Sequence, residues 1–203
     1  MSSTVLYMSM SLDGFIAGPE DGPGNGLGND GERLHAWLGE PDGGVRPSFQ
    51  PPGESGEVFN EMLATGAVLV GRRTFDLADR WNGDHHGVSI FVPTRGEPPE
   101  PPSELVHYVT DGVESAVRQA KEAAGEADVM VHGADLAQSL LRAGALDELE
   151  IHLVPVLLGE GRRLFEHLGA DHLDLELTRV IDAPGVTHLR YRVRRPSAEQ
   201  SPR

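Results

Sequence analysis

Three short segments combine glycine or threonine with charged side chains directly after apolar runs. Their sequences are Gly71-Arg72-Arg73-Thr74, Pro93-Thr94-Arg95 and His132-Gly133-Ala134-Asp135. Glycine lets a backbone approach a ligand closely, and guanidinium groups bind phosphate through paired hydrogen bonds. Taken singly, each segment is better interpreted as a tight turn whose arginines pair with local carboxylates. Taken together, in an acidic chain, they indicate a site for a ligand that carries phosphate groups.

The elements that must position these segments follow from hydrophobic periodicity. The pattern predicts strands at residues 4–10, 67–70, 88–92, 105–109, 128–131, 148–158, 173–181 and 186–193. It predicts helices at residues 32–38, 54–65, 74–81, 112–124 and 135–143. Strands alternate with helices and then give way to a hairpin, which is typical of a three-layer α/β fold with a mixed, mainly parallel sheet. Ligands of such sheets bind at the carboxyl ends of the strands, where the three segments fall.

Composition limits the classes of partner. The chain has 203 residues, a net charge of −15, no cysteine and Lys121 as its only lysine. This acidity disfavours nucleic acid and anionic membranes, and the lack of thiols excludes disulfides and thiolate metal sites. The first residues do not form a signal peptide, and apolar runs stay well below the roughly 20 residues of a membrane helix. We therefore expect a cytoplasmic protein.

The domain organisation is expected to be simple. Residues 1–195 are predicted to form one domain with a Gly/Pro-rich insertion at residues 19–52, and residues 196–203 a disordered tail. The insertion contains a literal G-x-G-x-x-G at residues 26–31. A dinucleotide fingerprint needs a strand directly before it, and residues 22–25 are turn-forming instead. We interpret this segment as a flexible loop.

A few other residues could act on a substrate. Asp13 follows the first predicted strand, where it could orient a substrate or a proton-donating water, although Asp-Gly is also a favoured turn pair. Phe59, Met62 and Trp81 could line a flat apolar pocket, with a core position favoured for Phe59 and Met62. The nine histidines show no metal-binding spacing, so no metal is expected.

Longer motifs resemble a known family. Residues 10–18, 70–75, 91–95, 131–136 and 154–165 are similar to motifs of the bacterial dihydrofolate-reductase-like family. This family includes the C-terminal reductase domain of the riboflavin-biosynthesis deaminase–reductase. The resemblance implies a sheet of about eight strands, NADPH as cofactor and a homodimer.

The resemblance also implies roles for individual residues. Cofactor phosphates would be contacted by Gly71, Arg72, Arg73 and Thr74. The pyrophosphate would be cradled by Gly133, Ala134, Asp135 and Leu136. Thr94 and Arg95 would hold the adenosine end and its 2′-phosphate. Ala17 would lie near the nicotinamide, and Asp13 would lie near the substrate with Phe59 and Trp81.

The expected activity is NADPH-dependent hydride transfer to a small heterocyclic or carbonyl substrate, of the riboflavin-pathway (5-amino-6-ribosylaminouracil phosphate) or pterin type. One departure from the family is His132, which stands where glycine is usual and where the following peptide is often cis. This departure motivates a second hypothesis, a non-catalytic nucleotide-binding protein on the same fold. A third hypothesis is a flavin or deazaflavin in the same cleft.

Overall fold

A mixed eight-stranded sheet forms the centre of the molecule. The computed structural model describes residues 2–41, 49–169 and 172–194. The strands are β1 (Thr4–Ser11), β3 (Ala67–Val70), β4 (Ser89–Pro93), β5 (Val106–Val109), β6 (Val129–His132), β7 (Glu148–Val154), β9 (Leu175–Ala183) and β10 (Val186–Val193). Their order is β5-β4-β3-β6-β1-β7-β10-β9. The first six are parallel, and β10 and β9 are antiparallel. This confirms the predicted fold class.

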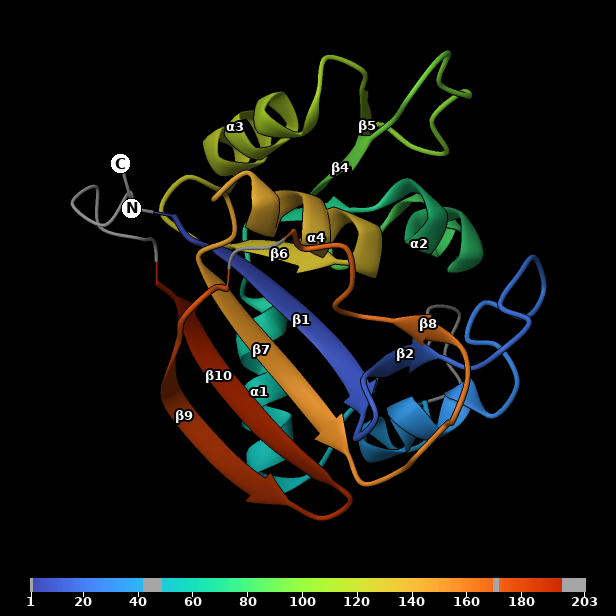
Figure 1. The fold of residues 1–203 in the computed structure, drawn as a ribbon. Helices are drawn as coiled ribbons and strands as arrows, with labels where there is room; N and C mark the ends of the chain where they lie inside the picture. The colour runs from blue at the N-terminus through green and yellow to red at the C-terminus, as the bar shows by residue number, and fades with distance from the viewer. Residues whose placement is uncertain (1, 42–48, 170–171, 195–203) are drawn as a thin grey trace.

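Helices cover both faces of the sheet. They are α1 (Gly53–Leu63), α2 (Arg72–Leu77), α3 (Val113–Ala124), α4 (Ala134–Arg142) and two 3-10 helices, η1 (Gly31–Leu38) and η2 (Asp79–Gly83). Helices α3 and α4 lie on one side of the sheet and α1 on the other (Figure 1). In α3, Ala116, Ala120 and Ala124 recur every four residues and are buried. Their small side chains form the stripe that meets the sheet.

The central strands are apolar on both faces. In β3, Val68 and Val70 join the core on the α1 side, whereas Ala67 and Leu69 join the core on the α3–α4 side. All four are fully buried. A parallel strand between two helical layers has no face toward water, which explains the continuous apolar run in the sequence.

Two predicted elements differ from the structure by more than two residues or by a break. The strand predicted at residues 148–158 ends at Val154, because Pro155 has no N–H for the ladder. The helix predicted at residues 74–81 is divided into α2 and η2, because the backbone is left-handed at Arg80, Trp81 and Asn82. A second, two-stranded sheet of β2 (Phe15–Ala17) and β8 (Arg162–Arg163) was not predicted. The predicted tail, residues 196–203, lies outside the described residues, as do residues 42–48 of the predicted insertion.

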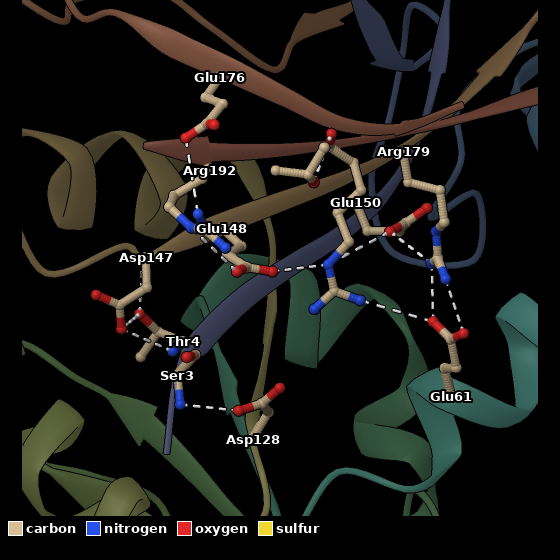
Figure 2. Close-up of polar contacts among 12 residues, drawn as sticks. Ser3, Thr4, Glu61, Asp128, Asp147, Glu148, Glu150, Glu176, Arg179 and Arg192 are labelled. Carbon is tan, nitrogen blue, oxygen red and sulfur yellow. Dashed lines mark hydrogen bonds and ion pairs between the residues drawn. The ribbon is translucent and has the colours of Figure 1, made fainter. Parts of the chain in front are cut away.

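Polar contacts fasten the amino-terminal edge of the parallel strands (Figure 2). The Ser3 N–H donates to Asp128 Oδ1, and the Thr4 N–H donates to Asp147 Oδ2. On the α1 face, the Arg179 guanidinium bridges Glu61 and the fully buried Glu150 at 2.7 and 3.0 Å. These bonds join β1, β6, β7, β9 and α1 to one another. At the opposite, carboxyl edge the parallel strands continue into loops.

Candidate functional site

Three neighbouring parallel strands end together at the carboxyl edge of the sheet. Strand β3 lies between β4 and β6, and Val70 at its end is opposite His132. The residues that leave the three strands are therefore neighbours in space: Gly71, Thr94 and Gly133. The Gly71 N–H donates to the His132 carbonyl at 3.1 Å, which fixes the first of these turns to the third.

Gly133 makes the closest contact between two of the predicted segments. Its φ is +99°, and a β-carbon built on it would lie 2.5 Å from Thr74 Oγ1. A β-carbon on Gly71 would lie 3.5 Å from the β-carbon of Leu136. The starts of α2 and α4 are therefore in contact, and only glycine satisfies both the space and the backbone conformation at position 133.

The first turn of α4 is not capped by a side chain. Gly133 stands at the N-cap, and the first backbone bond of the helix is from the Ala137 N–H to the Gly133 carbonyl. The N–H groups of Ala134, Asp135 and Leu136 precede that bond, so they have no carbonyl partner within the helix. Backbone N–H groups arranged in this way suit an anionic ligand, although the carboxylate of Asp135 on the same turn opposes it.

The two arginines of α2 have carboxylate partners. Arg72 Nε is 2.6 Å from Asp76 Oδ2, and its guanidinium lies over the ring of Tyr108. Arg73 Nη2 is 3.0 Å from Asp21 Oδ2 and donates also to the Asp21 carbonyl. Both arginines thus follow β3 at the carboxyl edge of the sheet, and each is engaged in an ion pair within the chain.

Two of the predicted site residues follow one another at the end of β4, and their side chains differ in whether they are bonded within the described part of the chain. Thr94 is buried, and its hydroxyl donates to the carbonyl of Val92 at 3.0 Å. Arg95 is exposed and, within the described part of the chain, has no ion pair. The guanidinium of Arg95 is therefore free to meet an anion at this corner.

The small sheet closes the other side of the carboxyl edge. Ala17 is buried in β2, which pairs with β8. A β-carbon on Gly161 would lie 2.0 Å from the Ala17 carbonyl oxygen, so the two backbones touch. The guanidinium of Arg163 lies 4.4 Å from the centre of the Phe15 ring. This ribbon brings the loop after β1 next to the segment after β7.

Asp13 has a structural role in this loop. Its Oδ1 accepts hydrogen bonds from Ser11 Oγ at 2.6 Å and from the Leu158 N–H, and its Oδ2 accepts from the Gly159 N–H at 2.7 Å. These bonds, the one from Ser11 above all, lower the pKa of the carboxyl group. Asp13 is therefore ionised at neutral pH, and a proton for a substrate would have to come from a water or another group.

An aromatic group surrounds His132 on the α1 face. Its ring lies 5.8 Å from that of Trp81 and 5.7 Å from that of His85. Burial lowers the pKa of His132 to about 4 and that of His85 to about 3, so both are neutral near pH 7. The His132 ring thus packs against Trp81 and His85, and the described residues contain no cis peptide. Nε2 of His132 is shielded from solvent without a partner in the described part of the chain.

A buried polar network on the same face was not predicted. Trp37 of η1 donates from Nε1 to Ser9 Oγ and contacts the rings of His152 and His188. Ser55 Oγ of α1 is 3.0 Å from His188 Nε2. The signals in the sequence were histidines at positions 152 and 188 within two predicted strands, and no local pattern links the two.

The remaining predicted pocket residues, Phe59 and Trp81, both pack against the core on the α1 side of the sheet. Phe59 is partly buried between the core under β3 and the core formed by η1 and β7, in keeping with its interpretation as a core residue. Trp81 contacts the edge of the Phe75 ring at 5.8 Å.

The described residues contain no group of acidic and histidine side chains arranged to bind a metal ion. Among these same residues, helices long and apolar enough to cross a bilayer are absent.

The strand order, the parallel centre and the carboxyl-edge loops define an α/β protein of the dihydrofolate-reductase-like fold. Within that class, the chain belongs to the family of RibD C-terminal domains, whose family profile matches residues 3–189. Its relatives include the uncharacterised protein YwjB of Bacillus subtilis, which is 29% identical over 168 residues that cover 81% of this chain and 83% of YwjB.

Solved structures show the same fold at lower identity. A putative riboflavin biosynthesis protein from Shewanella sp. PV-4 superposes with a TM-score of 0.71 at 22% identity, covering 95% of this chain and 99% of that one. The riboflavin biosynthesis reductase Rib7 of Saccharomyces cerevisiae gives 0.58 at 17% identity, with 95% and 90% covered. RibD of Acinetobacter baumannii superposes with a TM-score of 0.57 at 20% identity, and the match covers 96% of this chain but 59% of RibD.

Proposed function

We propose that this protein is an NADPH-dependent reductase that transfers a hydride to a small heterocyclic or carbonyl substrate of the riboflavin-pathway or pterin type. The observation that carries the proposal is the contact between the Gly71 and Gly133 turns, next to the uncapped start of α4. Membership of the RibD C-terminal domain family supports it, because related chains are named as riboflavin-biosynthesis reductases.

The residues at this edge fit a dinucleotide phosphate. The backbone N–H groups of Ala134, Asp135 and Leu136 would bind the pyrophosphate, with Gly71 and Thr74 on its other side. The open guanidinium of Arg95 would bind the adenosine 2′-phosphate. Ala17 would lie against the nicotinamide, which supplies the hydride when the cofactor is bound. Arg72 and Arg73 would take part after exchanging a carboxylate for phosphate.

The substrate side is less open than the sequence suggested. Trp37 of η1 lies against His152 of β7 and His188 of β10, and Asp13 holds the turn at Gly159. A substrate near the nicotinamide would therefore meet Trp81 and His132 rather than a wide pocket beside Phe59. Asp13 would act on the substrate indirectly, by fixing the loop that ends at Ala17.

The filled substrate side favours a second candidate, a nucleotide-binding protein without turnover. Thermal-shift titration with NADPH, NADH, a flavin and a deazaflavin tests the cofactor, because a ligand at about 100 times its Kd stabilises the folded state by roughly 2.7 kcal/mol. A reductase should be stabilised most by NADPH and should oxidise it with a pterin, pyrimidine or carbonyl acceptor. Stabilisation without oxidation by any acceptor supports the second candidate, and stabilisation by flavins alone contradicts NADPH as the cofactor.

We also propose that two copies of the chain associate through the β9–β10 end of the sheet. Leu175, Leu177 and Val180 of β9 are 44%, 52% and 53% exposed. They pair across strands with Val193, Tyr191 and Leu189, so they share a face with the α3–α4 core. An apolar strand at a sheet edge is a ready interface. Light scattering should report a dimer that Leu177→Glu dissociates, and a monomeric wild-type protein would contradict the proposal.

A further inference from the structure

Two arginines from distant segments converge on one carboxylate at the carboxyl edge. Asp21 Oδ2 lies 3.0 Å from Arg73 Nη2 and 2.9 Å from Arg162 Nε. The side chain of Asp21 is only 16% exposed. Burial raises the pKa of Asp21, but the hydrogen bonds and positive charges of Arg162 and Arg73 together outweigh it and lower the pKa, so Asp21 is a carboxylate at neutral pH.

Asp21 is delivered by the loop that directly follows β2. The Gly18 N–H donates to the Leu27 carbonyl, and the Asn29 N–H donates to that of Pro19. A β-carbon on Gly26 would lie 2.5 Å from the Leu77 carbonyl oxygen, so the loop rests directly on α2. The ion pairs of Asp21 therefore join this loop to both α2 and β8.

The two arginines flank the proposed phosphate site. Arg73 precedes Thr74, whose hydroxyl touches Gly133. Arg162 follows Gly161, whose backbone touches Ala17. The pair thus spans from the α2–α4 contact to the β2–β8 ribbon, and Asp21 occupies the position between them.

The single carboxylate of Asp21 offers fewer hydrogen-bond acceptors than the two guanidinium groups have donors. Each guanidinium has five N–H donors in a planar fork, and a phosphate offers more acceptor oxygens and as much or more charge than a carboxylate. Asp135 and Glu166 add further negative charge around Arg162, which disfavours a phosphate beside Asp21 and favours one that replaces it.

We propose that Arg73 and Arg162 form a phosphate-binding clamp and that Asp21 competes with the ligand for it. Binding then requires the carboxylate to leave, and Asp21 sets how tightly the site holds a phosphate. The phosphate belongs either to the dinucleotide of the proposed function or to a phosphorylated substrate. Only the dinucleotide source rests on the proposed function.

The test compares two acidic residues of the same loop. Asp21→Asn removes the competing charge. Glu20→Gln removes an equal charge, and among the described residues the Glu20 carboxylate accepts a hydrogen bond from Asn29 and pairs with no arginine. Calorimetric titration with inorganic pyrophosphate should give about 3- to 10-fold tighter binding for Asp21→Asn than for wild type, because the fraction of open clamp rises. Glu20→Gln should match wild type. Adding Arg162→Gln to Asp21→Asn should abolish the gain.

The outcomes separate the clamp from the cofactor. Equal pyrophosphate affinity of Asp21→Asn and Glu20→Gln, or weaker binding by Asp21→Asn, would overturn the clamp. Should Asp21→Asn not fold, Arg162→Gln alone must weaken pyrophosphate binding several-fold, and unchanged binding overturns the clamp equally. A gain that extends to NADPH assigns the dinucleotide as the source, and a gain with ribose 5-phosphate alone assigns a phosphorylated substrate. Wild type that binds pyrophosphate but not NADPH contradicts the proposed function only.

Discussion

The Nδ1 atoms of His152 and His188 face each other at 2.8 Å in the buried network between β7, β10 and η1. Only one of the two can carry a proton there, because two N–H groups would repel. Both rings are almost fully buried. Burial holds the pKa of His152 well below its ordinary value and lowers that of His188 to about 4. The folded protein thus keeps this pair neutral.

This pair predicts a loss of stability in mild acid. Between pH 6.5 and about 4, the unfolded chain binds protons that the folded histidines refuse, so the free energy of unfolding falls as pH falls. Urea unfolding at steps from pH 7 to pH 4 should show this slope. His188→Gln should reduce the slope of unfolding free energy against pH by the equivalent of about one bound proton. A midpoint that stays constant over the range would contradict the neutral pair.

Replacement of Gly133 should damage the site more than its backbone conformation alone explains. Gly133→Ala places a β-carbon against Thr74 and also strains a positive φ. Gly144→Ala strains a positive φ where a β-carbon would have open space, so it is the matched control. We expect about 1 kcal/mol of destabilisation for Gly144→Ala and 2–4 kcal/mol for Gly133→Ala, with weaker NADPH binding only in the latter. Equal losses of stability for Gly133→Ala and Gly144→Ala would show that the Thr74 side chain moves aside at little cost in free energy.

Arg95→Ala should discriminate between the two nicotinamide cofactors. A charge-assisted contact to the 2′-phosphate is worth about 1.5–3 kcal/mol, so the NADPH Kd should rise by roughly 10- to 100-fold. The NADH Kd should change little. Arg118→Ala, which removes the same charge from α3, serves as the control for net charge. An equal loss for NADPH and NADH would assign Arg95 a role other than the 2′-phosphate.

The ion-pair network on the α1 face should depend on Arg179 more than on its exposed neighbours (Figure 2). Arg179→Met leaves the fully buried Glu150 with the more distant Arg190, at 3.8 Å. We expect a loss of about 3 kcal/mol in unfolding free energy. Arg192 is 57% exposed, and its two ion pairs are 3.7 and 3.8 Å long. Arg192→Met should therefore cost less than about 1 kcal/mol.

Most of the sheet could be predicted because periodicity is a local property. The apolar runs of β3, β4 and β6 are buried on both faces, and each ends at a turn-forming residue. The prediction was wrong where one residue interrupts a pattern. Pro155 ends β7 inside an apolar run, and the left-handed backbone at Trp81 divides a helical one.

The site was only partly predictable, because partners come from afar. The turns at Gly71 and Gly133 could be placed next to each other from the sheet alone. The position of the Asp21 carboxylate between Arg73 and Arg162 could not be predicted, since it depends on how a glycine-rich loop packs on α2. The network of Trp37, His152 and His188 likewise joins segments whose proximity no local pattern encodes.

The place of β1 in the middle of the sheet has a consequence for how the protein is made. Its two neighbours, β6 and β7, belong to the second half of the chain, and Thr4 is bonded to Asp147, 143 positions away. During synthesis β1 lacks its full pair of partner strands until β6 and then β7 have left the ribosome, so its apolar side chains stay exposed while the first half of the chain is made. Nascent chains should therefore engage chaperones early, and the sheet should assemble late and all at once.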